Sequence, residues 1–334
     1  MTPWAALRVV VVRDGDELVA VAPFYAERRL GRATRYRLLG ARTSHRVEPL
    51  AKPGTQEEAA RVIARELFRS QPRPAVICFD SVDIASGWPE RLVEAWPARV
   101  RPWMCREWSG PAPTVTLAGL TFDDWMRSKS PNFRSQARRL RRRLEARGGR
   151  FCLACTEGEL ERGLAEMGRL HYARWRDRGG STALDSSVER ALVEAGRELL
   201  ASGRFRLMSI EVEGRAISAQ LFLAAGGEVS YWNGGFDEAW AAEQPSMRVL
   251  VAAVEDAFGR SDRRLDLGGG AESYKYRLAD GEDVLETTLV VPRDKRYRLT
   301  RLQLVPHRVR RELTRRLPGQ VQRRLRQVGR GRRR

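Results

Sequence analysis

Three consecutive glycines join a short apolar run to side chains that can carry protons. The run at 265–267 leads into glycines at 268–270, and Tyr274 and Lys275 follow within a few residues. Glycine accepts positive φ and lets a ligand approach the main chain closely. The pattern indicates a strand end that opens into a binding site, and a glycine turn before a surface helix is the alternative.

A second group of such side chains lies on a predicted helix earlier in the chain. His171 and Trp175 are four residues apart and project from one helical face, and Arg174 and Arg178 repeat this spacing on a neighbouring face. A histidine beside a cleft can take a proton from an amine near neutral pH, whereas a structural histidine is the alternative. The two arginines can hold an anionic substrate.

The elements that must position these side chains occur twice. Strand-like runs at 7–12 and 18–24 flank a glycine turn, and runs at 205–212 and 216–223 do the same. In each half, a run with helical spacing and a further strand come next. We interpret this order as an internal duplication.

The second half is the more complete copy. Its predicted elements are a strand at 151–156, helices at 159–176 and 187–202, three antiparallel strands ending at 233, a helix from Pro245, a strand at 264–267, a short helix and final strands at 284–291. A loop is expected at 234–237. Proline in a first turn, with serine beside it as a cap, is a signal for the start of a helix.

Length and composition set outer limits. With 334 residues and 42% hydrophobic content, the chain has room for about two domains. The longest apolar run, at 216–225, is shorter than the roughly 18 residues of a membrane span. The first residues show no signal-peptide pattern, so we expect a cytoplasmic protein. Cys152 and Cys155 have no second pair at zinc spacing, and no metal is expected.

The net charge of +19 is concentrated in two segments. Residues 127–150 hold ten basic side chains and one acid, and residues 292–334 hold seventeen basic side chains and two acids. The rest of the chain is therefore net acidic. Arginine dominates the excess, and guanidinium groups bind phosphates in a bidentate manner. Nucleic acid, anionic lipid head groups and phosphorylated substrates are the expected partner classes, and coding bias toward arginine is the alternative.

Four motifs carry a family resemblance. They are Asn132-Phe133-Arg134 with the arginine-rich helix after it, the segment from His171 to Gly179, the segment from Tyr231 to Asp237, and the segment from Asp266 to Lys275. In this order, over roughly 120–291, they resemble the GNAT acyltransferase superfamily and its CelD-like type, associated with bacterial cellulose and exopolysaccharide biosynthesis. The duplication also resembles the FemAB-type peptidyltransferases, which are tandem GNAT proteins.

The resemblance implies an α/β fold of tandem GNAT-like domains, with mixed central sheets flanked by helices. In GNAT proteins two strands splay apart so that main-chain donors face the thioester, and the next helix start receives the pyrophosphate of coenzyme A. The splayed pair here would be 228–233 and 264–267. An acetyl-CoA or other acyl-CoA donor would contact Asn233, Gly234, Gln244, Ser246, Met247 and Arg248. The loop before this helix lacks the usual glycines, which leaves an aminoacyl-tRNA donor open.

The same resemblance assigns roles to individual side chains. Tyr274 would protonate the leaving thiolate, Lys275 would stabilise the acyl group or a phosphate, and Asp266 would orient them or act as base. His171 would accept the proton of the amine. Packing of the tyrosine, exposure of the lysine and turn capping by the aspartate are the alternatives. Substrate contacts would come from Arg174, Trp175, Arg178, Trp232, Gly268, Gly270 and Glu272.

We expect four regions along the chain. They are a truncated or degenerate GNAT-like domain at 1–118, an arginine-rich helical connector at 119–150, a GNAT acyltransferase domain at 151–292 and a basic amphipathic tail at 293–334. The first half starts directly at its hairpin, so we expect missing N-terminal residues. It also lacks the glycine cluster, which predicts one active site, in the second half. The tail could lie on an anionic membrane surface or bind RNA.

Two classes of function follow from these patterns. The first is an acyltransferase that moves an acyl group from acyl-CoA to an amine or hydroxyl of a sugar or cell-envelope precursor, with a peptidyltransferase that uses aminoacyl-tRNA as the alternative enzyme. The second is a non-catalytic GNAT-like protein that binds nucleic acid or membrane through its basic segments.

Overall fold

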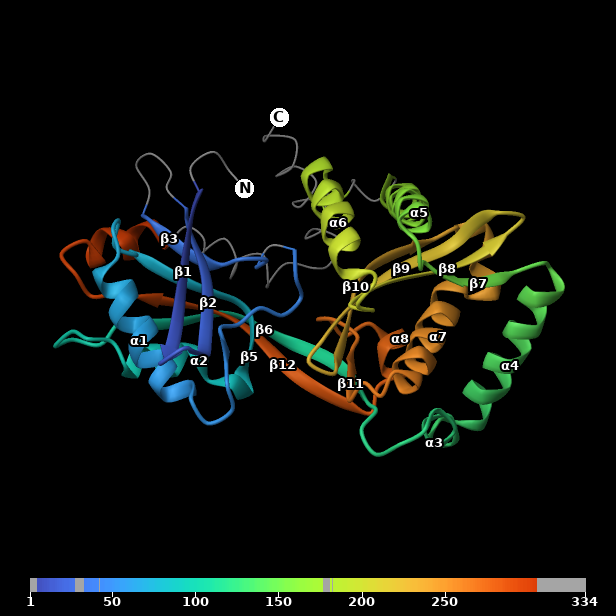
Figure 1. Cartoon of the computed structure of the whole chain (residues 1–334), viewed down its shortest axis with the longest axis horizontal. Helices are drawn as coiled ribbons and strands as arrows, with labels where there is room; N and C mark the ends of the chain where they lie inside the picture. The colour runs from blue at the N-terminus through green and yellow to red at the C-terminus, as the bar shows by residue number, and fades with distance from the viewer. Residues whose placement is uncertain (1–4, 28–32, 42, 177–180, 182, 305–334) are drawn as a thin grey trace. The chain divides into compact units, whose positions relative to one another are not determined.

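The structure is a computed structural model in which two compact units can be described. It describes residues 5–27, 33–41, 43–176, 181 and 183–304, so the predicted substrate residue Arg178 and most of the basic tail lie outside it. One unit comprises residues 1–110 and 284–334, and the other comprises residues 111–283 (Figure 1).

Most of the chain lies in twelve strands, eight α-helices and two short 3₁₀ helices within the described residues. The strands are β1 (Ala5–Asp14), β2 (Glu17–Glu27), β3 (Arg35–Leu38), β4 (Leu50–Ala51), β5 (Val76–Asp83), β6 (Trp103–Thr116), β7 (Arg150–Leu153), β8 (Phe205–Val212), β9 (Arg215–Ala225), β10 (Glu228–Phe236), β11 (Arg264–Asp266) and β12 (Gly281–Val291). The helices are α1 (Gln56–Arg69), η1 (Ile84–Ser86), α2 (Trp88–Glu94), α3 (Phe122–Ser128), α4 (Pro131–Ala146), α5 (Glu157–Arg176), α6 (Ser186–Leu199), η2 (Glu238–Glu243), α7 (Pro245–Gly259) and α8 (Ser273–Tyr276).

The first unit is built on the strand order β1-β2-β3-β5-β12. The β1/β2 hairpin is antiparallel, and β3 pairs with β5 in parallel. Helix α1 buries Ile63 and Leu67 in one apolar core with Phe24, Tyr36 and Phe79 of the strands. Its amphipathic spacing is the reason that one face of this helix is buried on the sheet.

The second unit has the strand order β7-β8-β9-β10-β11-β6. Helices α5 and α6 cover one face of these strands, whereas α7, with α4 beside it, covers the other (Figure 1). Both faces of β8 are therefore buried: Met208 packs in the core on the α7 side and Leu207 in the core on the α5 side. This alternation follows from the two-residue period of a strand.

The predicted fold class is confirmed: both units are mixed sheets flanked by helices. The two units also repeat one detail of pairing. Strand β3 pairs with β5 over 35–37 and 76–78, and β10 pairs with β11 over 228–230 and 264–266. In both cases three residues pair in parallel after an antiparallel hairpin and an intervening helix, as the duplication predicts.

The units divide the chain differently from the expected regions. The arginine-rich segment belongs to the second unit because Phe133, Ala137 and Leu144 of α4 pack into the core on the α7 side. Residues from 284 onward belong to the first unit because β12 pairs with β5 from Leu285 to Val290.

Two predictions of local structure were wrong in detail, and one strand was missed. The predicted loop at 234–237 is largely strand, because β10 continues to Phe236 in pairing with β9. The predicted strand ending at Thr156 stops at Leu153. Strand β6 was not predicted at all, because Pro111 and Pro113 argue against a strand in the sequence.

Candidate active site

Strands β10 and β11 separate after three residues of pairing. Ser230 of β10 is the last residue opposite β11, where it faces Asp266. Beyond this point the chain follows β6 instead: the Leu267 N–H donates to the Pro113 carbonyl (3.0 Å) and the Gly270 N–H donates to the Pro111 carbonyl (2.8 Å). Strand β10 thus loses its parallel partner, at the place where the sequence predicts a splayed pair.

The register of β10 against β9 also shifts between Tyr231 and Asn233. An extra residue in one strand bends it and changes the direction in which its side chains point. The shift coincides with the loss of the β11 partner. Within the described residues, the pairing of β10 with β11 does not continue beyond Ser230.

The glycine loop after β11 is held by Asp266 and Lys275. Asp266 Oδ1 accepts a hydrogen bond from the Gly268 N–H at 2.7 Å. The Lys275 ammonium donates to the carbonyls of Gly268 and Gly269, both at 2.9 Å, and pairs with Glu272 at 3.0 Å. Lys275 is only 4% exposed, so its ammonium lies inside the loop.

These contacts give Lys275 and Asp266 positions that differ from those first expected. Lys275 is buried against main-chain carbonyls, neither solvent-exposed nor open to a phosphate. Asp266 caps the turn that follows it, which is the alternative role that the sequence left open. Both side chains position the loop that carries Tyr274.

The loop requires glycine at two positions. Gly268 has a φ of 77° and Gly270 a φ of 125°, conformations that side-chain-bearing residues rarely adopt. A Cβ at Gly270 would also lie 2.5 Å from the Glu272 carboxylate. The two glycines therefore let the chain turn back over the Lys275 ammonium.

Four side chains interact electrostatically where β10 and β11 separate: the phenols of Tyr231 and Tyr274, the Arg174 guanidinium and the Glu272 carboxylate. Burial, followed by Glu272, raises the pKa of Tyr274 to about 12, and Arg174 opposes this. The pKa of Tyr231 is raised by burial first and by Tyr274 second, and Arg174 again opposes the shift. Both phenols are therefore protonated near neutral pH, and each can donate a proton.

Arg174 is the positive charge of this cluster. Its guanidinium lies 5.1 Å from the ring centre of Phe236 on β10, and the side chain is half-buried. No ion pair with a described residue neutralises it. A half-buried guanidinium next to two phenols stabilises negative charge that develops between them.

His171 lies in the packing between α5 and β10. It is 3% exposed, and its Nε2 lies 2.8 Å from Ser181 Oγ. Burial is the main cause that lowers the pKa of His171; the Gly234 backbone opposes this, Arg174 adds to it, and the Asn233 side chain opposes it. The imidazole is neutral near pH 7, but its burial keeps it from solvent.

The strand residues predicted to contact the donor or substrate have structural contacts. Asn233 Oδ1 accepts the Gly234 N–H at 2.8 Å, and Trp232 is buried with the core on the α5 side. A Cβ at Gly235 would lie 2.7 Å from the backbone nitrogen of His171, so this glycine allows α5 to approach β10. Trp175 is 38% exposed, with its ring centre 6.2 Å from that of His171.

The four residues at the start of α7 that were predicted to contact the donor have different structural contacts. Gln244 occupies the N-cap with a φ of 49° and provides no side-chain cap. The side chain of Ser246 turns toward β9, where Gln220 Nε2 donates to its Oγ at 2.7 Å. Met247 packs against the core, whereas Arg248 is half-buried and donates to the Ala137 carbonyl of α4 at 2.7 Å.

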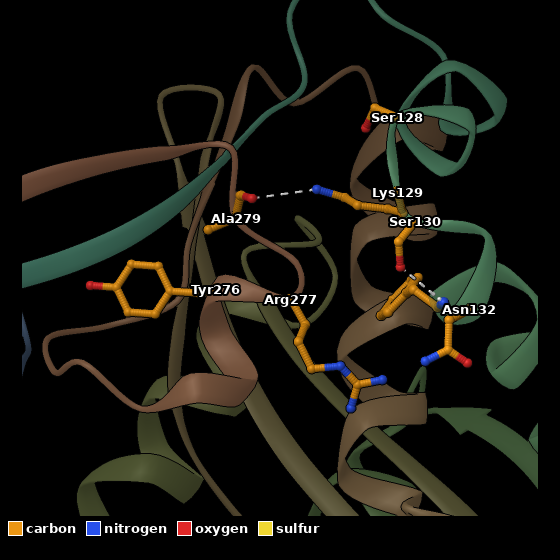
Figure 2. Close-up of a pocket in the computed structure, with 8 residues that line it drawn as sticks. Ser128, Lys129, Ser130, Asn132, Tyr276, Arg277 and Ala279 are labelled. Carbon is orange, nitrogen blue, oxygen red and sulfur yellow. Dashed lines mark hydrogen bonds between the residues drawn. The ribbon is translucent and has the colours of Figure 1, made fainter.

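A separate cavity of about 340 Å³ lies between the α3–α4 junction and the end of α8 (Figure 2). Lys129 reaches across to the carbonyls of Leu278 and Ala279, at 2.6 and 3.4 Å, and Arg277 lies over the ring of Phe133 at 5.4 Å. None of the predicted site residues lines this cavity.

Tyr231 is the site residue that the sequence did not single out. It was noted only within a motif, whereas its neighbour Trp232 was chosen as a substrate contact. Alternation along β10 places the two rings on opposite faces: Tyr231 packs toward the core on the α7 side and Trp232 toward α5. The two-residue period was the signal that could have found it.

The second unit contains a domain of the GNAT acyltransferase type. Residues 131–276, which lie in the second unit, match the family model described as Acetyltransferase (GNAT) domain. The chain thus carries a GNAT acetyltransferase domain, and it is an acyl- or acetyltransferase. No curated protein sequence matches the chain.

Solved structures share the fold at low sequence identity. The chain is similar to FemX, with a TM-score of 0.65, 13% identity and coverage of 88% of this chain and 90% of that one. It is also similar to L-PGS from Bacillus licheniformis, with a TM-score of 0.55, 12% identity and coverage of 90% and 88%. These likenesses concern the fold and include both units.

The described residues lack two kinds of feature. No group of three or more histidine, cysteine, aspartate or glutamate side chains there could hold a metal ion. None of the described helices is long and apolar enough to cross a membrane.

Proposed function

We propose that the second unit transfers an acyl group directly from acyl-CoA to an amine or hydroxyl where β10 and β11 separate. The observation that carries this proposal is the loss of the β11 partner at Tyr231, next to two protonated phenols and the Arg174 guanidinium. A strand edge without a ladder can donate to a thioester carbonyl, and a phenol can protonate the leaving thiolate.

In this proposal each side chain has one task. Main-chain N–H groups of β10 polarise the thioester carbonyl, and Arg174 stabilises the negative charge of the tetrahedral intermediate. The acceptor oxygen or nitrogen forms the new bond to the acyl carbon, and Tyr274 gives its proton to the thiolate as the carbon–sulfur bond breaks. The proton that the acceptor loses then restores the Tyr274 phenol. Lys275 and Asp266 keep the Tyr274 loop in place.

We further propose a sugar or cell-envelope precursor as the acceptor. The support is the resemblance of four sequence motifs to CelD-like proteins. An aminoacyl-tRNA donor is the runner-up, favoured by two observations: the start of α7 lacks the glycines of the usual coenzyme A loop, and the arginine-rich α4 packs beside α7.

Thermal unfolding with candidate donors tests the proposal. A donor at 100 times its dissociation constant adds about 2.7 kcal/mol of stability. Acetyl-CoA should raise the unfolding temperature, and release of free coenzyme A should then depend on an added amine or hydroxyl acceptor. Stabilisation without release, with any acceptor, would favour a binding protein. Activity that requires charged tRNA and is destroyed by ribonuclease would favour the runner-up.

A further inference from the structure

A groove of about 820 Å³ runs between α3, α4 and α7 in the second unit. Five arginines line it: Arg127, Arg134, Arg138, Arg141 and Arg248. Asp123 and Glu255 are the two acids of its wall, and apolar side chains that include Phe122 and Val251 form part of its lining. The volume lies within the range of small-molecule sites, roughly 300–1,000 Å³.

The spacing of the arginines separates the groove face of α4 from its outer faces. Arg134, Arg138 and Arg141 follow one another by four and three residues, which places them on one face of the helix. Arg139 lies on another face, and neither Arg139 nor Arg142 lines the groove. The sequence showed arginines on all sides of this helix, and the structure identifies the ones that converge.

Some arginines of this region already have partners. Arg127 pairs with Asp124, and Arg141 Nε lies 2.8 Å from Glu145. Arg147, beyond the groove on the same helix, pairs with the buried Glu243 at 2.7 Å. These guanidinium groups are neutralised within the protein and need no external anion.

Arg138 and Arg248 differ from them. Arg138 makes no hydrogen bond or ion pair with any residue that the structure describes. Arg248 makes a single hydrogen bond, to the Ala137 carbonyl, and no ion pair. Burial, and then Arg141, lowers the pKa of Arg248, so its charge is held at a cost without a carboxylate contact. An anion in the groove would supply the missing opposite charge.

We propose that this groove binds the nucleotide end of the acyl donor, with its phosphates on Arg138 and Arg248. The inference rests on the proposed transfer from acyl-CoA. Coenzyme A carries a pyrophosphate and a ribose 3′-phosphate, which guanidinium groups bind in a bidentate manner. Arg248 lies in the first turn of α7, and Val251 and Glu255 extend the groove along the same helix.

The arrangement favours a nucleotide over an RNA strand. Arginines from three helices converge on a bounded groove with Phe122 and Val251 in its wall, which suits a base and a compact set of phosphates. An RNA backbone tracked along α4 would use Arg139 and Arg142, which do not line the groove, as well, because such binding depends on total local charge.

The test compares two charge reversals on one helix. Coenzyme A and 3′-dephospho-coenzyme A are titrated into the full chain by calorimetry, at 0.15 M salt to screen long-range attraction. We expect Arg138→Glu to weaken coenzyme A binding by about tenfold or more, the effect of losing a charge-assisted contact, and Arg139→Glu to change it by less than about twofold. Dephospho-coenzyme A should lose less than coenzyme A in Arg138→Glu.

Arg248→Met, which preserves much of the side-chain length, provides a second variant. It should also weaken coenzyme A binding, and the unfolding temperature of each variant shows whether it is folded. If coenzyme A binds all four proteins equally, the groove proposal is overturned and the proposed transfer stands. Equal weakening by Arg138→Glu and Arg139→Glu would likewise overturn it. If coenzyme A binds none of them, the proposed donor is wrong as well.

Discussion

The buried ammonium of Lys275 gives the most direct test of how the active-site loop is held. Replacing it by methionine keeps an unbranched side chain of similar length but removes the donor to the carbonyls of Gly268 and Gly269. A polar group left unsatisfied inside a protein costs about 1–3 kcal/mol. With two carbonyls left unsatisfied, the free energy of local opening of the loop should fall by at least about 2 kcal/mol. This is roughly a thirtyfold change in the equilibrium constant for opening. Glu272 adds little, because its side chain is 56% exposed.

Hydrogen exchange with mass spectrometry measures this loss where it occurs. Peptides that cover 264–277 should exchange roughly thirtyfold faster in Lys275→Met, because local opening becomes easier by about 2 kcal/mol. The matched control is Lys52→Met, which removes a lysine that is 44% exposed and pairs with Glu17 on the surface. Surface pairs contribute about 0–1 kcal/mol, so exchange around Lys52 should change by no more than about fivefold. Equal, small changes at both sites would refute the assigned role of Lys275.

Three further predictions concern neighbouring residues. Tyr274→Phe should slow transfer by about a hundredfold or more with donor binding intact, and the wild-type rate should not fall through Tyr274 ionisation until the pH nears 12. Because the pKa of His171 is lowered, wild-type stability should decline as the pH drops below about 6.5, the ordinary histidine value, and His171→Gln should flatten that decline in melting temperatures. Gly235→Ala should lower the melting temperature, since its Cβ meets the α5 backbone at 2.7 Å, whereas Gly259→Ala, with no atom within 4 Å, should raise it slightly.

Local sequence patterns predicted the elements whose partners are close in the chain. Helix α1 follows the first hairpin as predicted, and both hairpins lie at the predicted glycine turns. Strand β6 depends on distant partners: the carbonyls of Pro111 and Pro113 accept hydrogen bonds from residues after β11. Proline lacks an N–H donor but keeps its carbonyl acceptor. A strand in which prolines act as acceptors is therefore not visible in its own sequence.

For the candidate site, the sequence likewise predicted where the residues lie in the chain but not the contacts that depend on the fold. The sequence located the segment with Lys275 and Tyr274, because glycines beside polar side chains mark it without knowledge of the fold. It did not predict that the Lys275 ammonium turns inward, since that depends on the left-handed turns at Gly268 and Gly270. Nor did it pair Tyr231 with Tyr274, whose interaction depends on where β10 and β11 separate.

The duplicated pairing explains why we place one active site in this chain. In the first unit Arg37, the last residue of the three-residue parallel pair, forms an ion pair with Asp80, which lies two residues beyond its strand partner Cys78; Arg37 Nη1 lies 2.5 Å from Asp80 Oδ1. By the same register, the corresponding residues of the second unit are Ser230 and Gly268, which cannot form an ion pair. Burial raises the pKa of the neighbouring Cys78 thiol to about 12, so it is protonated and unreactive near neutral pH. The same parallel pair thus carries an ion pair in one copy and leads into the glycine loop before Tyr274 in the other.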